Sequence, residues 1–223
     1  MNHLRLESVG NVRLVVAWLD QQGPLDRFLS SHELQRASRF RSPLHRRRYV
    51  NGRGLLRMLL AEHVGIDPKR LDLVASDHGK PRLSTHPEAP FNMAHSENLA
   101  IYAFASDGEE VGVDIEVIRS VDELGLAKVC FSDLEQNALN QLAPAARLGA
   151  FFNGWVRKEA IIKADGRGMS LPLDSFSVCL GEPAELIVTP PKAIPTRWTL
   201  RSVQVAPWAR AAVATSMPDF VFV

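Results

Sequence analysis

The chain has few of the features that stabilise a protein outside a packed core or attach it to a membrane. Among its 223 residues only Cys130 and Cys179 are cysteines, and their spacing indicates no disulfide framework. No apolar run approaches the roughly 18 residues of a membrane span, and the first residues lack the apolar segment of a secretion signal. We therefore expect a cytoplasmic protein with reduced thiols and no membrane partner, stabilised by a buried core.

The sequence also lacks the motifs that mark several common enzyme classes. It contains no Gly-x4-Gly-Lys-Ser/Thr phosphate loop and no Gly-x-Ser-x-Gly elbow, which argues against P-loop nucleotide hydrolases and α/β-hydrolases. Its histidines other than His95 have no metal-binding spacing. The net charge is only +1 at pH 7, so the chain as a whole gives no reason to expect nucleic acid binding.

One segment of the chain lacks acidic residues altogether. Between Glu33 and Glu62 there is no Asp or Glu, whereas the segment contains Arg36, Arg39, Arg41, Arg46, Arg47, Arg48, Arg53 and Arg57. Such a cluster repels itself unless it meets an anion, and the guanidinium fork matches the oxygens of phosphate. A solvated basic face would also explain most of these arginines. A nucleic-acid surface is less favoured, because no aromatic residues for base stacking are interleaved with them.

Strands and helices are predicted in both halves of the chain, and the hydrophobic pattern changes period at most of their boundaries. We predict helices at about 31–40, 43–64, 121–128, 132–141 and 144–165. We predict strands at about 12–19, 71–75, 91–96, 99–105, 111–117, 175–180, 184–189, 197–205 and 210–216. Each half thus has a strand, a long helix and a sheet, which favours an α+β protein of two similar subdomains. The boundary should fall near Asp107–Glu110, giving residues 1–108 and 109–223.

The most informative helix is the last one, which should end at the pair Gly166 and Gly168, because glycine supplies the positive φ that closes a helix. It is too apolar to be a surface helix. One slowly drifting stripe of it carries Trp155, Glu159 and Lys163, at i, i+4 and i+8. Buried charges must be paired, metal-bound or in a cleft. A core helix with one Glu–Lys pair is the plainer interpretation of this segment.

A second segment alternates apolar and acidic residues. In the predicted strand 111–117, Asp114 and Glu116 face one side, while Val113, Ile115 and Val117 face the other. Two carboxylates on one face repel each other, so a cation is expected near them. With Glu159 as a third oxygen donor, the set suits a hard cation such as Mg²⁺, with Mn²⁺ as an alternative.

These two segments together resemble a known family. Gly112-Val-Asp-Ile-Glu116, followed after about forty residues by Trp155-x-x-Lys-Glu-Ala-x-x-Lys163-x-x-Gly-x-Gly168, is similar to the paired motifs of the 4′-phosphopantetheinyl transferases of the Sfp type. The resemblance runs from about Arg36 to the end of the chain. It implies a pseudo-dimer of two α/β subdomains, a monomer with internal pseudo-symmetry, with the active site in the cleft between the halves.

The resemblance also implies a set of coenzyme A contacts. Arg48 matches a basic position that grips the 3′-phosphate, and Arg36 lies near a second one. The turn Gly79-Lys80-Pro81 matches an adenine and phosphate loop. Residues 91–96 match the family segment Phe-Asn-x-Ser-His-Ser, in which His95 would reach a phosphate, and Ala94 replaces a serine, which predicts one missing hydroxyl contact. The full expected set is Arg36, Arg48, Gly79, Lys80, Pro81, Met93, Ala94, His95, Asp114, Lys158 and Lys163.

The resemblance implies the reaction as well. The enzyme would transfer 4′-phosphopantetheine from coenzyme A to a serine of an apo acyl, peptidyl or aryl carrier protein, releasing 3′,5′-ADP. Asp114, Glu116 and Glu159 would hold Mg²⁺, Glu159 would also act as the base, and Lys163 would act on the leaving phosphate. Two alternatives remain: another Mg²⁺-dependent nucleotide-pyrophosphate transferase, or a non-catalytic anion-binding module.

Overall fold

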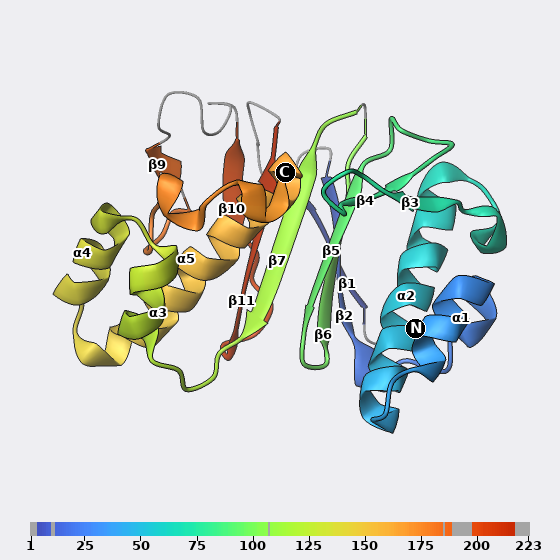
Figure 1. Ribbon diagram of the computed structural model, residues 1–223, viewed down its shortest axis with the longest axis horizontal. Helices are drawn as coiled ribbons and strands as arrows, with labels where there is room; N and C mark the ends of the chain where they lie inside the picture. Colours follow the sequence, from blue (N-terminus) through green and yellow to red (C-terminus); the bar gives the residue numbers. More distant parts are fainter. Residues whose placement is uncertain (1–3, 10–11, 107, 185, 189–197, 217–223) are drawn as a thin grey trace.

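Two antiparallel sheets form the centre of the molecule. The computed structural model describes residues 4–9, 12–106, 108–184, 186–188 and 198–216 (Figure 1). The first sheet has the strand order β1-β2-β6-β5, with β1 at Leu4–Val9, β2 at Val12–Trp18, β6 at Leu99–Phe104 and β5 at Phe91–Ser96. The second has the order β10-β11-β7, with β10 at Thr199–Ser202, β11 at Ala209–Thr215 and β7 at Val111–Val117.

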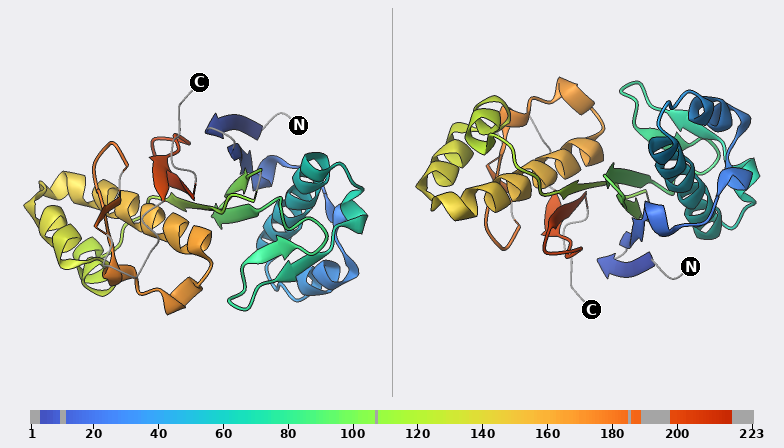
Figure 2. Two further views of the ribbon diagram at one scale, coloured as in Figure 1. Left: turned by 90° about the horizontal axis from the view of Figure 1, so that it is seen from above. Right: turned by 90° about the horizontal axis from the view of Figure 1, so that it is seen from below.

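The two sheets meet where β5 and β7 lie side by side (Figures 1 and 2). These strands belong to separate sheets, and side chains of β5 bond to the backbone of β7. The Val113 backbone N–H donates to Asn92 Oδ1 at 3.2 Å, and that of Val117 donates to Ser96 Oγ at 3.1 Å. Since these backbone groups are buried and need partners, Asn92 and Ser96 join the two halves of the chain.

Helices cover the outer faces of both sheets (Figure 2). In the first half, α1 spans Ser31–Ser38 and α2 spans Pro43–Val64; in the second, α3 spans Glu123–Cys130, α4 spans Asp133–Gln141 and α5 spans Pro144–Asp165. Both long helices begin with a proline and end at a glycine in the left-handed conformation, Gly65 at φ 72° and Gly166 at φ 82°. None of the helices in the described part of the chain is long and apolar enough to cross a bilayer.

The strands alternate between two cores. Leu14 and Val16 of β2 pack with Val113 and Val213 in a core shared by the two sheets. Val15 and its neighbours on the other face pack under α2 instead. Two further clusters lie around α5, which packs on β7 and β11. The period of two predicted from the sequence therefore sorts the strand residues between these layers.

The helices at 43–64 and 144–165 and the strands at 91–96 and 111–117 are confirmed, and so is the α+β class. Three expectations about strands were wrong. Leu4–Val9 forms an edge strand that we did not expect, 175–180 is a strand only at Ser177–Val178 (β8), and 197–205 only at Thr199–Ser202. The Arg157 guanidinium bonds the carbonyls of Cys179 and Gly181, which replaces strand pairing there. The expected strand 184–189 lies partly outside the described residues, and Leu186–Val188 form β9. The remaining short strands are β3 at Leu73–Ala75 and β4 at Pro81–Leu83.

Each half packs a 22-residue helix, α2 or α5, on its sheet. The sheets differ, with four strands in the first and three in the second. The internal pseudo-symmetry and the division at 108/109 therefore stay predictions.

Candidate active site

A cleft of about 400 Å³ opens between the two halves beside the end of α5. From the first half it is lined by the turn before β4 and by β5, and from the second half by α5 and the segment after it. Several expected residues line it, namely Gly79, Lys80, Pro81, Met93, Glu159 and Lys163. His78, Asn92, Ile162, Gly166, Gly168, Leu171, Pro172 and Leu173 complete the lining. The structure thus brings the second-half motif residues and the turn of the first half to one place.

A glycine sets how closely α5 approaches β7. A Cβ atom at Gly112 would lie 2.1 Å from the carbonyl oxygen of Ala160 and 2.2 Å from the backbone nitrogen of Ala164. Any side chain here would push the helix away from the strand. The close contact allows Lys163 of α5 to reach Asp114 of β7, with Nζ 2.6 Å from Oδ1. Gly112 of the first motif therefore allows Lys163 of the second motif to contact Asp114.

Asp114 is the most perturbed acid of the site. Its side chain is 7% exposed, and Oδ2 has no hydrogen-bond partner within the part of the chain that the structure describes. Burial raises the pKa of Asp114 to about 7, with smaller contributions in the same direction from Glu159 and Glu116, although Lys163 opposes them. Burial also raises the pKa of Glu159. A buried carboxylate oxygen without a partner, next to two more acids, fits a divalent cation.

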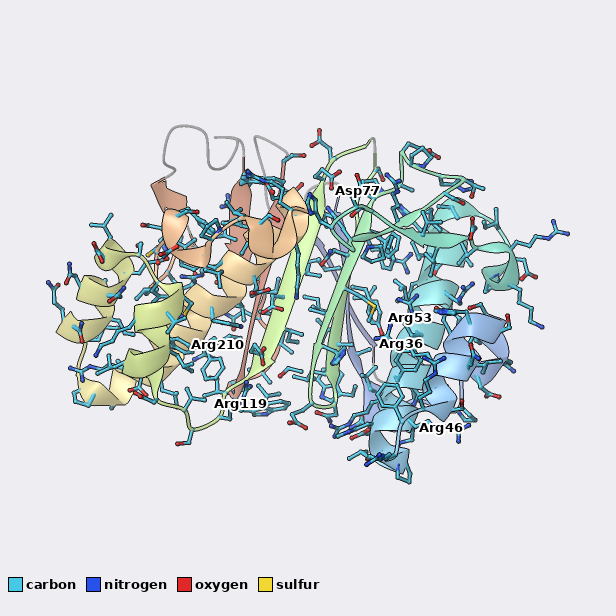
Figure 3. The ribbon with its side chains drawn as sticks, in the orientation of Figure 1. Arg36, Arg46, Arg53, Asp77, Arg119 and Arg210 are labelled. Carbon is cyan, nitrogen blue, oxygen red and sulfur yellow. The ribbon has the colours of Figure 1, made fainter. Side chains whose placement is uncertain are left out.

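The other expected metal ligand is held by neighbours on both sides. Glu116 Oε2 accepts hydrogen bonds from Ser96 Oγ at 2.7 Å and from Arg119 Nη1 at 3.1 Å. Arg119 lies just beyond the end of β7 (Figure 3). Among the described residues, no group of three His, Cys, Asp or Glu side chains is arranged to hold a metal ion. Asp114, Glu116 and Glu159 therefore do not form a complete metal site in the arrangement that the structure describes.

His95 on β5 and Arg48 on α2 are candidate site residues outside the described lining of the cleft. The His95 side chain reaches solvent, yet the surrounding protein still desolvates its ring and lowers its pKa, and the cations of Lys163 and Arg48 act in the same direction. Arg48 is already paired, since it contacts Asp20 at 2.8 Å and Glu97 at 2.9 Å. Its hydrogen bonds to Asp20 raise the pKa of Arg48 further.

Comparison with known proteins identifies the family. A family model described as the 4′-phosphopantetheinyl transferase superfamily matches residues 110–216, and one described as 4′-phosphopantetheinyl transferase, N-terminal, matches residues 21–107. The chain is 38% identical to the 4′-phosphopantetheinyl transferase HetI of Nostoc sp., over 73% of this chain and 70% of that protein. It is 34% identical to the 4′-phosphopantetheinyl transferase ffp of Bacillus subtilis, over 86% of this chain and 84% of that protein. For the transferase Sfp of Bacillus subtilis (strain 168) the identity is 32%, with the same coverage of 86% and 84%.

The chain belongs to the 4′-phosphopantetheinyl transferase family. It is a transferase, and the hypothesis of a non-catalytic anion-binding module loses its basis.

Several residues that the resemblance assigns to coenzyme A are not in the described lining of the cleft of this transferase, namely Arg36, Arg48, Ala94, His95, Asp114 and Lys158. Lys158 is fully buried, with its ammonium 2.8 Å from Glu135, and it donates to the carbonyls of Leu173 and Phe176. Burial lowers the pKa of Lys158, opposed by Glu135. The Ala94 side chain packs in the core between the sheets. A serine hydroxyl at that position would also point into this core, so the expected loss of a contact does not follow from the side chain.

Lys80 lines the cleft but is held by protein groups in this transferase. Its ammonium donates to the carbonyl of Ala164 at 2.8 Å and pairs with Glu110. The lysine therefore caps the C-terminal end of α5, where helix carbonyls lack intrahelical partners. It connects the turn of the first half with the long helix of the second.

Several arginines of the arginine-rich segment pair with acidic residues that lie outside the segment. Glu33, just outside the segment, is buried and binds Arg53 at 2.7 Å and Arg57 at 2.6 Å. The expectation of an unneutralised cluster was therefore wrong for these two arginines, because α1 packs its acid against α2. It was also wrong for Arg47 and Arg48, which pair with Asp20. Arg36 lies over the Tyr49 ring, 5.7 Å from its centre, and is exposed (Figure 3).

Sequence reasoning missed three parts of the site. Asn92 and Ser96 fix the seam between β5 and β7, and Leu171–Leu173 form one wall of the cleft. The spacing of Asn92 and Ser96, two polar residues on the same face of one strand, was a usable signal for them. The wall gave no such signal, because an apolar turn looks like an ordinary core segment.

Proposed function

We propose that this enzyme transfers the 4′-phosphopantetheine group of coenzyme A to a serine of an apo carrier protein in the cleft beside α5. The bond between the serine oxygen and the pantetheine-linked phosphorus forms, and the pyrophosphate bond to 3′,5′-ADP breaks. One observation supports this location of the reaction. Glu159 and Lys163 line a cleft walled by both halves, and Lys163 contacts the buried Asp114, whose Oδ2 atom has no hydrogen-bond partner among the described residues.

A divalent cation, Mg²⁺ or Mn²⁺, would be held by Asp114, Glu116 and Glu159. The unpartnered Asp114 Oδ2 and the raised pKa values of Asp114 and Glu159 support this assignment, because a cation would relieve both. When bound, the cation neutralises negative charge on the pyrophosphate oxygens. Ser96 and Arg119 keep the Glu116 carboxylate in place through its Oε2 atom.

Glu159 is the proposed base. Burial raises the pKa of its carboxyl above the ordinary value, and the ionised carboxylate within reach of the serine would accept its proton. It would take the proton of the carrier serine, directly or through a water molecule. Its place in the lining of the cleft gives it access to a substrate that enters from solvent.

Lys163 is the proposed stabiliser of the leaving group. Its ammonium is partly exposed and contacts Asp114. With the acid engaged by a cation, the ammonium is available to the phosphate of 3′,5′-ADP, on which charge grows as the bond breaks. Positioning and charge neutralisation supply most of the catalysis in phosphoryl transfer.

The rest of coenzyme A would lie along the first half. The turn Gly79–Pro81, Met93 and His95 would contact the nucleotide and its phosphates. Arg48 would bind the 3′-phosphate, with Arg36 as a second basic contact. Both arginines lie on the helices of the first half, and the cations of Arg48 and Lys163 both lower the pKa of His95, which supports placing Arg48 and His95 on the same side of the coenzyme A site.

The carrier protein is the second substrate. Acyl, peptidyl and aryl carriers of fatty acid, polyketide or nonribosomal peptide synthesis all present the same serine chemistry. The free thiols of Cys130 and Cys179 agree with a cytoplasmic location. We further propose that the enzyme acts as a monomer, since both walls of the cleft come from one chain.

The test is the mass of a carrier protein after incubation with the enzyme, coenzyme A and Mg²⁺. We expect a gain of one phosphopantetheine per carrier and release of 3′,5′-ADP, and no gain with Glu159→Gln. A panel of carriers would identify the pathway served. If coenzyme A is consumed while every carrier keeps its mass, the activity is that of another nucleotide-pyrophosphate transferase.

A further inference from the structure

A buried ion pair lies directly behind the proposed catalytic residues. Lys158 and Glu135 are 0% and 1% exposed, and their charged atoms are 2.8 Å apart. Lys158 immediately precedes Glu159 on α5, yet its side chain points away from the cleft into the second half. A buried ion pair commonly adds little net stability, so its presence here calls for another reason.

The pair connects three separate segments. The Lys158 ammonium donates to the carbonyl oxygen of Leu173 at 2.7 Å and to that of Phe176 at 2.5 Å, and it lies 4.2 Å from the centre of the Phe176 ring. Together with Glu135, these acceptors use all three of its N–H groups. Glu135 in turn accepts from the Val178 backbone N–H at 2.8 Å.

The segment held in this way is a wall of the cleft. Leu171, Pro172 and Leu173 line the cavity opposite the turn of the first half, together with Glu159. Without this donor, the part-buried carbonyl of Leu173 and the buried carbonyl of Phe176 would each lose a hydrogen bond. The position of the wall relative to Glu159 is therefore set by Lys158, one residue away on the helix.

We propose that Lys158 is a positioning residue, which through its bonds to the carbonyls of Leu173 and Phe176 fixes the wall 171–173 against the cleft-facing side of α5. It shapes the coenzyme A site from behind and does not touch the substrate. This inference rests on the proposed location of coenzyme A in the cleft.

The neighbouring Arg157 provides a matched control. It is an equally buried cation on the same helix, but it binds the carbonyls of Cys179 and Gly181 and the side chains of Glu182 and Ser202. None of these residues is in the described lining of the cleft. Arg157→Met should therefore lower thermal stability and leave turnover per folded molecule and the KM for coenzyme A close to wild type.

The experiment compares Lys158→Met, Glu135→Gln and the double variant Lys158→Met/Glu135→Leu. The single Lys158 change strands a buried carboxylate, whereas the double variant removes both charges and should recover most of the lost Tm. We expect the double variant still to lose about tenfold or more in kcat/KM for coenzyme A per folded molecule, because the wall has lost its donor. Backbone amides of 173–178 should exchange with deuterium faster in it than in wild type.

Glu135→Gln gives a second measurement if the double variant fails to fold. The carboxylate of Glu135 is not needed for the bonds from Lys158 to Leu173 and Phe176, so Glu135→Gln should keep a KM near wild type, while Lys158→Met raises it. A double variant with restored Tm, wild-type kinetics and unchanged exchange would overturn the role of Lys158. Equal KM values for the two single variants would do the same. Absence of transfer by the wild-type enzyme would instead overturn the proposed function, so the two failures are distinguishable.

Discussion

At the scale of single residues, Asp114 carries the strongest electrostatic signal. Its pKa in the folded protein is about 7, above the ordinary value of 3.8, because burial disfavours its charge. Ionisation of Asp114 therefore opposes folding: the penalty is absent below its ordinary pKa and grows as the pH rises toward the folded value. Because Asp114 is buried in the site, its ionisation makes the free energy of unfolding depend on pH.

We predict that Asp114→Asn abolishes transfer and removes this pH dependence. Without divalent cations, the free energy of unfolding of wild type should fall relative to that of Asp114→Asn between about pH 4 and pH 7. Urea denaturation across that range measures the difference. Parallel curves for the two proteins would show that Asp114 does not ionise against a penalty.

Lys163 should act on turnover far more than on binding. Lys163→Met keeps the length of the side chain and removes its charge, so an interaction that strengthens in the transition state is lost. We expect turnover to fall by roughly two orders of magnitude or more, with calorimetric affinity for coenzyme A and Mg²⁺ changing less than about tenfold. If the lysine only pairs with an acid on a core helix, turnover per folded molecule will stay near wild type.

Arg48 should distinguish coenzyme A from dephospho-coenzyme A. The exposed carboxylate of Glu97 can turn to solvent and leave the guanidinium to a phosphate. Arg48→Ala should raise the KM for coenzyme A roughly ten- to a hundredfold, the range of a charge-assisted contact, and change that for dephospho-coenzyme A much less. Arg47→Ala, on the same helix but more exposed, is the matched control. Equal losses with both nucleotides would remove Arg48 from the 3′-phosphate site.

At the scale of elements, the close contact between α5 and β7 gives a sharp prediction. Gly112→Ala would place a Cβ atom 2.1 Å from the Ala160 carbonyl oxygen, so the helix must move. We expect a loss of stability on the order of 1–3 kcal/mol or more and loss of turnover, because Lys163 would no longer meet Asp114. Gly23→Ala has nothing within 4 Å of its added atom and should behave as wild type in both thermal unfolding and turnover.

The sequence predicted those elements whose boundaries are set locally. Proline at the first turn and glycine after the last one defined 43–64 and 144–165, and period-two alternation defined 111–117. It could not show that Glu33 neutralises arginines some twenty residues away. Helix geometry predicted that Lys158 points away from Glu159, but not that it pairs with Glu135. These contacts of Glu33 and Lys158 depend on which helices pack together, and residues far apart in the sequence decide that. The acidic residues of β7 and the pair Glu159 and Lys163 of α5 were predictable from the sequence. Their charged side chains recur at the period of a strand and of a helix, so the pattern places them on one face.

At the scale of the whole molecule, the site exists only because two sheets join along β5 and β7. The joint is made by side chains of Asn92 and Ser96 and by a shared apolar core. The same two residues lie next to the cleft and to Glu116. The seam that holds the halves together therefore borders the candidate site through Asn92, which lines the cleft, and Ser96, which donates to Glu116.

We propose that coenzyme A binds in this cleft through a divalent cation held by Asp114. Calorimetric titration of coenzyme A into wild type and Asp114→Asn, with Mg²⁺ and with a chelator, tests it most directly. We predict one coenzyme A per wild-type chain, bound at least about tenfold more tightly with Mg²⁺, and no effect of Mg²⁺ on the variant. Equal affinity of wild type with and without Mg²⁺, or an unchanged Mg²⁺ effect in the variant, would show that coenzyme A is not bound through a cation on Asp114.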